Sequence, residues 1–135
     1  MTAPDGIDVV RAAFDAYQRG DEPAMFALVS EDVVARQFPD QLDVRDYRGH
    51  AGLREMMAAW IGTWDDWSIE LLSAWEVGGL VFASAYQRGR GSGSGVPMQA
   101  EVTFVFEVHE GRIDRWRMFR SEREALDAVA ADAQA

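Results

Sequence analysis

The sequence predicts an α+β fold in which helices come first and a curved, mostly antiparallel sheet follows. The first reason is the spacing of apolar residues. In the main segments up to Trp64 they recur every three or four positions, as in a helix, and after Asp65 they recur at every second position, as in a strand. The second is that glycine-rich breaks separate long alternating segments near the C-terminal end of the chain. Helices first and strands afterwards favour an antiparallel sheet that curls around the helices.

The length and composition fit one globular domain. A chain of 135 residues commonly forms a single domain, which we expect to span residues 1–135. Hydrophobic residues make up 48% and charged residues 27%, as is usual for globular proteins. The segment MTAPDGIDVV has neither a basic stretch nor a long apolar run, so we expect no signal peptide, no membrane span and a cytoplasmic location.

The composition also excludes several kinds of chemistry. There is no cysteine, which rules out disulfides, zinc–thiolate sites and cysteine nucleophiles. There is no lysine, which rules out Schiff-base mechanisms and phosphate-binding lysines. A net charge of -10 disfavours nucleic acid and anionic lipid as partners. We expect no metal and no cofactor.

Two helices are predicted at the start of the chain. The first spans residues 5–19, because Ile7, Val10 and Phe14 recur at helical spacing and a glycine follows at position 20. Asp21 then caps a second, short helix that carries a proline in its first turn, where the missing N–H has no cost.

A third helix carries the strongest helical pattern. It follows a short predicted strand over residues 32–38 and a polar loop over residues 39–49. Its apolar residues lie on one helical face. They are Leu53, Met56, Met57, Trp60, Ile61 and Trp64.

A long β-hairpin is predicted after Asp65. Apolar residues occupy alternate positions up to Val77, the pair Gly78–Gly79 follows, and alternation resumes from Leu80 to Arg90. If Val77 pairs with Leu80, the register has three consequences. It places Trp75 opposite Phe82, Leu71 opposite Tyr86 and Ile69 opposite Arg88.

The segment RGRGSGSGVPM joins this hairpin to a third long strand. A phosphate-binding glycine loop would lead into a helix, but the next residues alternate as a strand over residues 98–108. We therefore interpret it as a connection between strands. A turn at residues 109–111, a fourth long strand over residues 112–120 and a short C-terminal helix over residues 122–130 follow.

The order of elements, together with FDAYQRGD, YRGHAGLREMM, RGRGSGSGV and VFEVHEGRIDRWRMF, resembles the nuclear transport factor 2-like superfamily and, more narrowly, its SnoaL-like proteins. The resemblance implies a cone-shaped α+β barrel, in which the curved sheet wraps around three N-terminal helices and leaves an apolar pocket open at one end. Members include polyketide cyclases, ketosteroid isomerases, limonene epoxide hydrolases and non-catalytic binding proteins. Homodimers packed through the sheet are common among them, so we expect a homodimer.

Two catalytic patterns of that superfamily are not retained. At the positions that match a ketosteroid isomerase, the tyrosine is replaced by Ala13, the aspartate base by Gln37, and the protonated aspartate falls near Val102 or Thr103. The last-strand aspartate of limonene epoxide hydrolases falls on Met118. His50 and His109 fit loop or capping roles better than acid–base catalysis.

The candidate pocket is mostly aromatic, and we expect it to take an apolar or aromatic small molecule. Each aromatic side chain could instead belong to the core. The candidate lining residues are Tyr17, Gln37, Phe38, Trp60, Trp64, Tyr86, Trp116 and Arg120. Arg88 and Arg90 are expected at its rim, where they would attract an anionic ligand.

Glu101 is the candidate acid–base residue. With Val108 opposite Ile113, Glu101 lies across from Arg120, either as a cross-strand ion pair or as a carboxylate inside the cone. A β-bulge after Ile113 would instead turn Trp116, Met118 and Arg120 inward.

Three functions therefore stay open. The first is a binding protein without chemistry of its own, and the second is a cyclase- or isomerase-type enzyme that uses Glu101. The third is a dimeric structural module. The sequence slightly favours a cyclase- or isomerase-related protein.

Overall fold

A computed structural model describes residues 5–41 and 44–134 of the chain. Four helices and six strands lie within those residues. The helices are α1 (Gly6–Gln18), α2 (Glu22–Ala27), α3 (Gly49–Ile61) and α4 (Glu122–Gln134). The strands are β1 (Val29–Arg36), β2 (Tyr47–Arg48), β3 (Trp64–Val77), β4 (Leu80–Gly91), β5 (Pro97–His109) and β6 (Arg112–Phe119).

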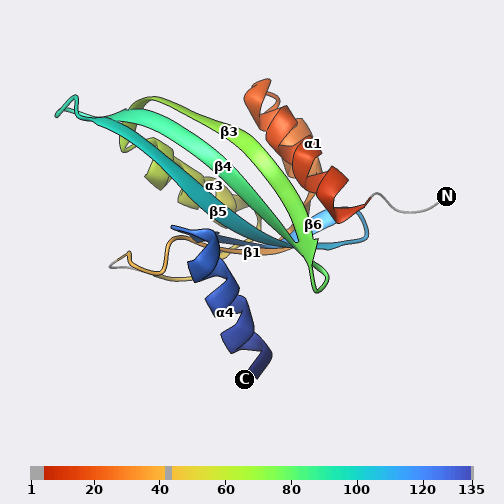
Figure 1. Cartoon of the computed structure of the whole chain (residues 1–135). Coiled ribbons are helices and arrows are strands. Elements are labelled where there is room, and N and C mark those ends of the chain that lie inside the picture. Colours follow the sequence, from red (N-terminus) through yellow and green to blue (C-terminus); the bar gives the residue numbers. More distant parts are fainter. Residues whose placement is uncertain (1–4, 42–43, 135) are drawn as a thin grey trace.

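All six strands form one curved sheet that does not close into a full barrel, with the order β2-β1-β6-β5-β4-β3. Neighbouring strands are antiparallel except β1 and β6, which run parallel. The long strands β3, β4 and β5 arch over α3, and α1 lies beside β3 (Figure 1). This arrangement confirms the predicted α+β class, in which the sheet wraps around the helices. In the part of the chain that the structure describes, no helix combines the length and hydropathy needed to span a membrane.

Both N-terminal helices have an aspartate N-cap: Asp21 was predicted as one, whereas Asp5 was predicted as the first residue of its helix. The side chain of Asp5 accepts a hydrogen bond from the backbone N–H of Ile7 at 3.1 Å, and that of Asp21 accepts one from Ala24 at 3.2 Å. Gly20 adopts a φ of 73° after α1, a conformation that glycine tolerates better than other residues. The buried face of α1 consists of Val9, Val10, Ala13 and Ala16.

The middle of the chain differs from the prediction in three places. Strand β1 starts at Val29, before the predicted start at residue 32, and ends at Arg36. The short strand β2 lies in the predicted polar loop, of which residues 42 and 43 are outside the described part. Helix α3 ends at Ile61, so Trp64 opens β3 and is not helical as predicted. Apolar spacing alone did not reveal that Gly62 serves as the C-cap of α3.

The β3–β4 hairpin confirms the predicted turn but not the full register. Val77 pairs with Leu80 and Trp75 with Phe82 around the two glycines, as predicted. Leu72 is an extra residue in β3, since the ladder steps from Leu71–Ala85 to Ser73–Ser84. The predicted pairs of Leu71 with Tyr86 and of Ile69 with Arg88 are therefore wrong. Ile69 pairs instead with Gln87, and Glu70 pairs with Tyr86.

Strand β6 also contains a bulge after Ile113, at the position given above as the alternative register. Val108 pairs with Ile113, but Glu107 pairs with Arg115, so Asp114 is the extra residue. The bulge turns Trp116 and Met118 toward the helices. Arg120, in contrast, lies past the end of β6 and is exposed to solvent.

The RGRGSGSGVPM segment connects two strands, as predicted. Two short backbone hydrogen bonds close the turn: Gly91 N–H donates to Val96 O at 2.8 Å, and Gly95 N–H donates to Gly91 O at 2.9 Å. Pro97 is the first residue of β5. No helix follows this turn, so its backbone N–H groups have no helix N-terminus to join in binding a phosphate.

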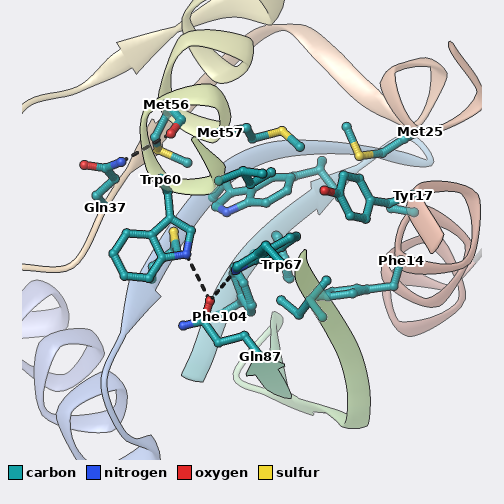
Figure 2. A pocket seen from close by; sticks show the side chains of 17 residues that line it. Phe14, Tyr17, Met25, Gln37, Met56, Met57, Trp60, Trp67, Gln87 and Phe104 are labelled. Atoms are coloured by element: carbon teal, nitrogen blue, oxygen red, sulfur yellow. Dashed lines mark hydrogen bonds between the residues drawn. The ribbon is translucent and has the colours of Figure 1, made fainter. Parts of the chain in front are cut away.

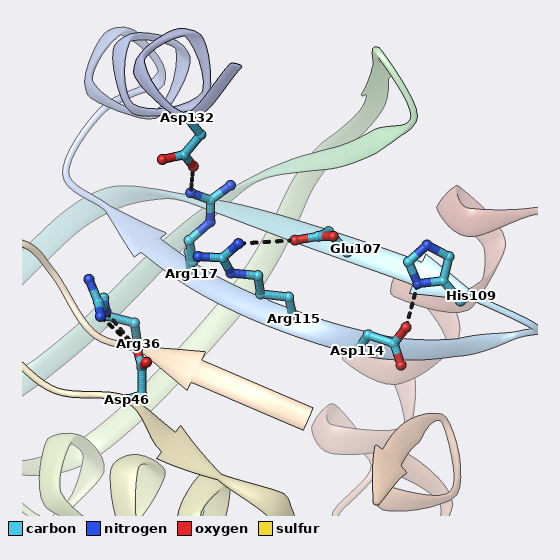
Figure 3. Close-up of polar contacts among 8 residues, drawn as sticks. All are labelled: Arg36, Asp46, Glu107, His109, Asp114, Arg115, Arg117 and Asp132. Atoms are coloured by element: carbon cyan, nitrogen blue, oxygen red, sulfur yellow. Dashed lines mark hydrogen bonds and ion pairs between the residues drawn. The ribbon is translucent and has the colours of Figure 1, made fainter. Parts of the chain in front are cut away.

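The sheet has an inner face toward α1–α3 and an outer face that α4 partly covers. Phe82, Val105 and Phe119 on the outer face form a separate apolar cluster with Ala125 of α4. Arg117 is only 8% exposed, and its guanidinium pairs with Asp132 of α4 at 2.6 Å (Figure 3). Charged pairs such as Arg115–Glu107 continue along the same face. The C-terminal helix extends to Gln134, beyond the predicted end at residue 130.

Candidate functional site

A cavity of about 70 Å³ lies between the inner face of the sheet and the first three helices. Figure 2 shows its side chains converging from helices and strands that are far apart in the sequence. The lining residues are Ala13, Phe14, Tyr17, Met25, Gln37, Met56, Met57, Trp60, Ile61, Trp67, Ile69, Gln87, Phe104, Phe106, Ile113, Trp116 and Met118.

The lining is almost entirely apolar. It contains no Asp, Glu, His or Arg among the described residues. Its polar groups are the Tyr17 hydroxyl, the side-chain amides of Gln37 and Gln87, and the N–H groups of three tryptophans. A site of this composition binds a ligand through shape and a few hydrogen bonds.

Gln87 organises the polar part of the cavity. Its side chain is 1% exposed, and its Oε1 accepts hydrogen bonds from Nε1 of Trp60 at 2.9 Å and of Trp67 at 3.1 Å (Figure 2). Two donors on one oxygen fix which way the amide points. They also satisfy two indole N–H groups that burial would otherwise leave unpaired.

Trp116 differs from these two tryptophans. Its ring meets Phe106 edge to face at 5.2 Å and Phe104 at 5.9 Å, both within the cavity wall. Its Nε1 is buried and has no hydrogen-bond partner. Trp64 also has a buried, unpaired Nε1, but Trp64 lies behind Trp60 at 5.5 Å and is not part of the lining.

The Tyr17 hydroxyl is the ionisable group of the described lining. Burial, and secondarily the carboxylate of Glu22, raise the pKa of Tyr17 above its ordinary value. The hydroxyl is therefore neutral at physiological pH and can donate a hydrogen bond. Its ring packs edge to face against Trp67 at 5.9 Å. Gln37, at the far side, donates from Nε2 to the backbone oxygen of Met56 at 3.3 Å.

Four of the candidate pocket residues lie together in the cavity wall: Tyr17, Gln37, Trp60 and Trp116. Phe38 is fully buried behind Trp60, with ring centroids 5.5 Å apart, and does not line the cavity. The guanidinium of Arg120 lies over the outer side of the Phe38 ring at 3.7 Å and pairs with Asp40 at 3.2 Å. The expected positions of Phe38, Trp64 and Arg120 in the lining are therefore corrected.

Four further candidates lie on the outer face of the sheet. Gln87 points inward, so its neighbours Tyr86 and Arg88 point outward, as does Arg90 two residues further along. The Tyr86 hydroxyl donates to Gln99 at 2.7 Å, and Arg88 lies over the Tyr86 ring at 5.1 Å.

Glu101 pairs with Tyr86 across β4 and β5, and it is exposed on this outer face. The predicted pairing of Glu101 with Arg120 is wrong, and so is the alternative that places this carboxylate inside the cone. The bulge at Asp114 shifts the β5–β6 register, and the last pair in that ladder is Thr103–Phe119. Arg88 and Arg90 likewise sit on the face away from the cavity, not at a shared rim.

Sequence reasoning missed Gln87 and Trp67 as site residues. Gln87 carried a signal, because it is the polar residue in the alternating set that it forms with Val81, Ala83 and Ala85. The two histidines lie outside the cavity lining. His50 Nε2 lies 2.8 Å from the backbone oxygen of Val29, and exposed His109 contacts Asp114 next to the turn (Figure 3).

The family model that matches the chain describes the SnoaL-like domain and covers residues 10–116. Since this is most of the sequence, the protein belongs to the SnoaL-like family. No curated protein matches the sequence significantly.

Solved structures share the fold at low sequence identity. A nuclear transport factor 2-like protein from Burkholderia thailandensis is 20% identical with a TM-score of 0.77, over 96% of this chain and 98% of that one. A protein with a ketosteroid isomerase-like fold from Catenulispora acidiphila, in complex with trimethylamine, is 16% identical with a TM-score of 0.69, over 90% and 88%. TerC, co-crystallised with polyporic acid, is 16% identical with a TM-score of 0.71, over 90% and 95%. These similarities establish the fold.

Proposed function

We propose that this SnoaL-like protein binds a neutral, ring-containing small molecule in the cavity between the sheet and the first three helices. The observation that carries the proposal is the lining, in which aromatic and aliphatic side chains surround a few oriented polar groups and no described residue bears a charge at neutral pH. A charged ligand would lose its hydration there without gaining a counter-ion. A neutral ring gains from apolar burial and from edge contacts with the surrounding aromatic rings.

The size of the cavity limits the ligand. An apolar cavity of roughly 150 Å³ accommodates benzene, and this one has about 70 Å³. Four methionines belong to its wall: Met25, Met56, Met57 and Met118. Methionine side chains are unbranched and rearrange easily, so they can make room for one substituted ring.

Two proteins of the same fold have been crystallised with small molecules, which supports the proposal only at the level of the fold. TerC was co-crystallised with polyporic acid, and the Catenulispora acidiphila protein was in complex with trimethylamine. Both are 16% identical to this chain, so neither ligand transfers to it.

A second candidate function is cyclase- or isomerase-type chemistry. The neutral Tyr17 hydroxyl favours it, because a buried donor can stabilise an enolate oxygen. The general base is missing from the described lining, and Glu101 is on the other face of the sheet. A dimeric structural module is the third alternative, and the homodimer stays a prediction.

Calorimetric titration with acetophenone tests the proposal. Ala13→Met fills the cavity from α1, while Ala12→Met adds the same side chain on the exposed face of that helix. We expect acetophenone to bind the unmodified protein and Ala12→Met, and to lose binding to Ala13→Met. No binding at all, or equal binding to both variants, would contradict the proposal.

The same ligand separates binding from catalysis. An isomerase-type base would remove a proton from the methyl group of acetophenone and form the enolate, whose carbon would then take a deuteron from heavy water. We expect no acceleration of this exchange by the protein. Acceleration that Tyr17→Phe reduces would support the enzymatic candidate instead.

A further inference from the structure

A ligand of the cavity needs an entrance, and the packing of the elements restricts where it lies. On the sheet side, backbone pairing is continuous from β3 through β4, β5 and β6 to β1. Helix α1 packs on α2 and β3, and the side-chain amide of Gln18 donates to the backbone oxygen of Ile69 at 2.8 Å. Helix α3 packs on β1, where Nε2 of His50 lies 2.8 Å from the backbone oxygen of Val29. The remaining boundary is the one between α3 and the pair α1–α2.

Side chains alone close this boundary. In residues 5–41 and 44–134, no backbone hydrogen bond joins α3 to α1 or α2. On the outside, the carboxylate of Glu22 pairs with the guanidinium of Arg54 at 3.1 Å, and both side chains are more than half exposed. The same guanidinium lies over the Phe26 ring at 4.2 Å. An exposed ion pair contributes little to stability, so this one can open and close readily.

Two methionines lie beneath the ion pair. Met25 follows Glu22 by three residues on α2, and Met57 follows Arg54 by three residues on α3. Residues spaced in this way lie on the same face of a helix. Figure 2 shows the Met57 side chain extending from α3 toward Met25 and Tyr17 on the opposite side. Because methionine is unbranched and adapts easily, Met57 can swing aside without a change in the backbone.

The exposure of the lining residues agrees with an entrance at this boundary. Four lining residues near the ends of α1 and α3 and near the start of β3 are half-buried: Tyr17, Met57, Ile61 and Trp67. The lining residues of β4 and β5 are buried. Gln37 is also half-buried, but its hydrogen bond to the backbone oxygen of Met56 ties the end of β1 to α3 there.

We propose that the ligand enters between α3 and the pair α1–α2, through a gate formed by the Glu22–Arg54 ion pair and the Met57 side chain. This inference rests on the proposed function and adds how the ligand reaches the cavity. Binding and release use the same passage. A gate therefore changes the association and dissociation rates by the same factor and leaves the dissociation constant as it is.

A removable cross-link across the gate tests the proposal. The chain has no cysteine, so Glu22→Cys combined with Arg54→Cys provides the two thiols that a bifunctional methanethiosulfonate joins and dithiothreitol releases. The matched control is Asp15→Cys with Arg19→Cys, which replaces an exposed ion pair of 2.7 Å within α1. Magnetic resonance line shapes during titration with acetophenone give both rates. We expect the cross-link between α2 and α3 to slow both at least about tenfold, with the dissociation constant within about twofold. Dithiothreitol should restore the rates, and the control cross-link should change neither rate.

A second pair of variants tests the methionine. Met57→Ala shortens the side chain at the gate and should speed association at least about threefold. Met118→Ala removes the same atoms from the deep wall, where Met118 is 7% exposed. This control should act through dissociation and leave the association rate within about twofold. Equal association rates in the two variants would contradict the role of Met57.

The outcomes separate the gate from the proposed function. If both cross-linked proteins exchange acetophenone as fast as the unmodified protein, the gate is overturned and the proposed function stands. A weaker affinity at an unchanged association rate overturns the gate too, because the cross-link then acts on the cavity and not on its entrance. If acetophenone does not bind the unmodified protein, the proposed function fails and takes the inference with it.

Discussion

Trp116 lies directly opposite Phe106 in the β5–β6 pair, and the two rings meet edge to face with centroids 5.2 Å apart in the cavity wall. This relationship depends on one extra residue, Asp114. Without it, alternation from Ile113 would turn Arg115 and Arg117 inward and Trp116 outward. In the structure, both arginines pair with carboxylates on the outer face (Figure 3). One bulge thus decides whether this wall of the cavity is aromatic or cationic.

Deleting Asp114 should therefore be severely destabilising. The shortened strand either places two guanidinium groups toward the apolar cavity or breaks its pairing, and we expect a loss of more than about 4 kcal/mol in the free energy of unfolding. Urea denaturation measures it. The control Asp114→Asn keeps the residue count and changes only an exposed contact with His109, so it should stay within about 0.5 kcal/mol. A deletion variant of unchanged stability would show that the bulge does not set the inward face.

The shared acceptor on Gln87 should contribute strongly to stability. Gln87→Met keeps the approximate volume but leaves the N–H groups of Trp60 and Trp67 unpaired, which we expect to cost about 2 to 5 kcal/mol. The comparison is Gln99→Met on the outer face, which removes an exposed acceptor of Tyr86 and should cost less than about 1 kcal/mol. Equal losses in urea denaturation would mean that the buried amide has no special role.

Tyr17 should make stability depend on pH in the alkaline range. Burial first, and the Glu22 carboxylate second, raise the folded-state pKa of this hydroxyl above that of the unfolded chain, which is about 10. The stabilisation is complete below pH of about 10 and is lost as pH rises through the folded pKa. Stability measured against pH should fall less steeply in this range for Tyr17→Phe. The difference in tyrosinate absorbance between the unmodified protein and Tyr17→Phe should show that the Tyr17 hydroxyl ionises late, and Glu22→Gln should make this ionisation earlier.

Helix α4 should be anchored by the outer apolar cluster. Ala125 is fully buried against the sheet, so Ala125→Glu places a carboxylate among apolar side chains and should cost about 3 kcal/mol or more. Ala130→Glu introduces the same residue at an exposed position of the helix and should change stability by less than about 0.5 kcal/mol. If thermal denaturation gave the two variants the same midpoint, the packing of α4 on the sheet would be refuted.

Much of the fold was predictable because local signals agreed with one another. The helix cap at Asp21, the two-glycine turn and the period of apolar residues each depend on neighbouring residues in the chain. The inward face of the strands was harder. The extra residues at Leu72 and Asp114 reverse the alternation; the one at Leu72 was not predicted, and the one after Ile113 was raised only as an alternative.

The same difference decides which candidate site residues were predicted correctly. Residues on helices or next to the first strand, such as Tyr17, Gln37 and Trp60, lie in the cavity wall. Candidates that required an exact strand register, such as Glu101 and Tyr86, lie on the opposite face. The partnership of Gln87 with two tryptophans joins α3, β3 and β4, and no local sequence pattern encodes such a contact.

The central claim is that the cavity takes up a neutral ring, and intermolecular nuclear Overhauser effects test it most directly. With acetophenone bound, we expect contacts from its ring protons to the methyl groups of Met56, Ile69 and Ile113 in the cavity wall. Contacts confined to exposed apolar residues such as Leu72, Val96 and Leu126, or no contacts with any methyl group, would contradict it.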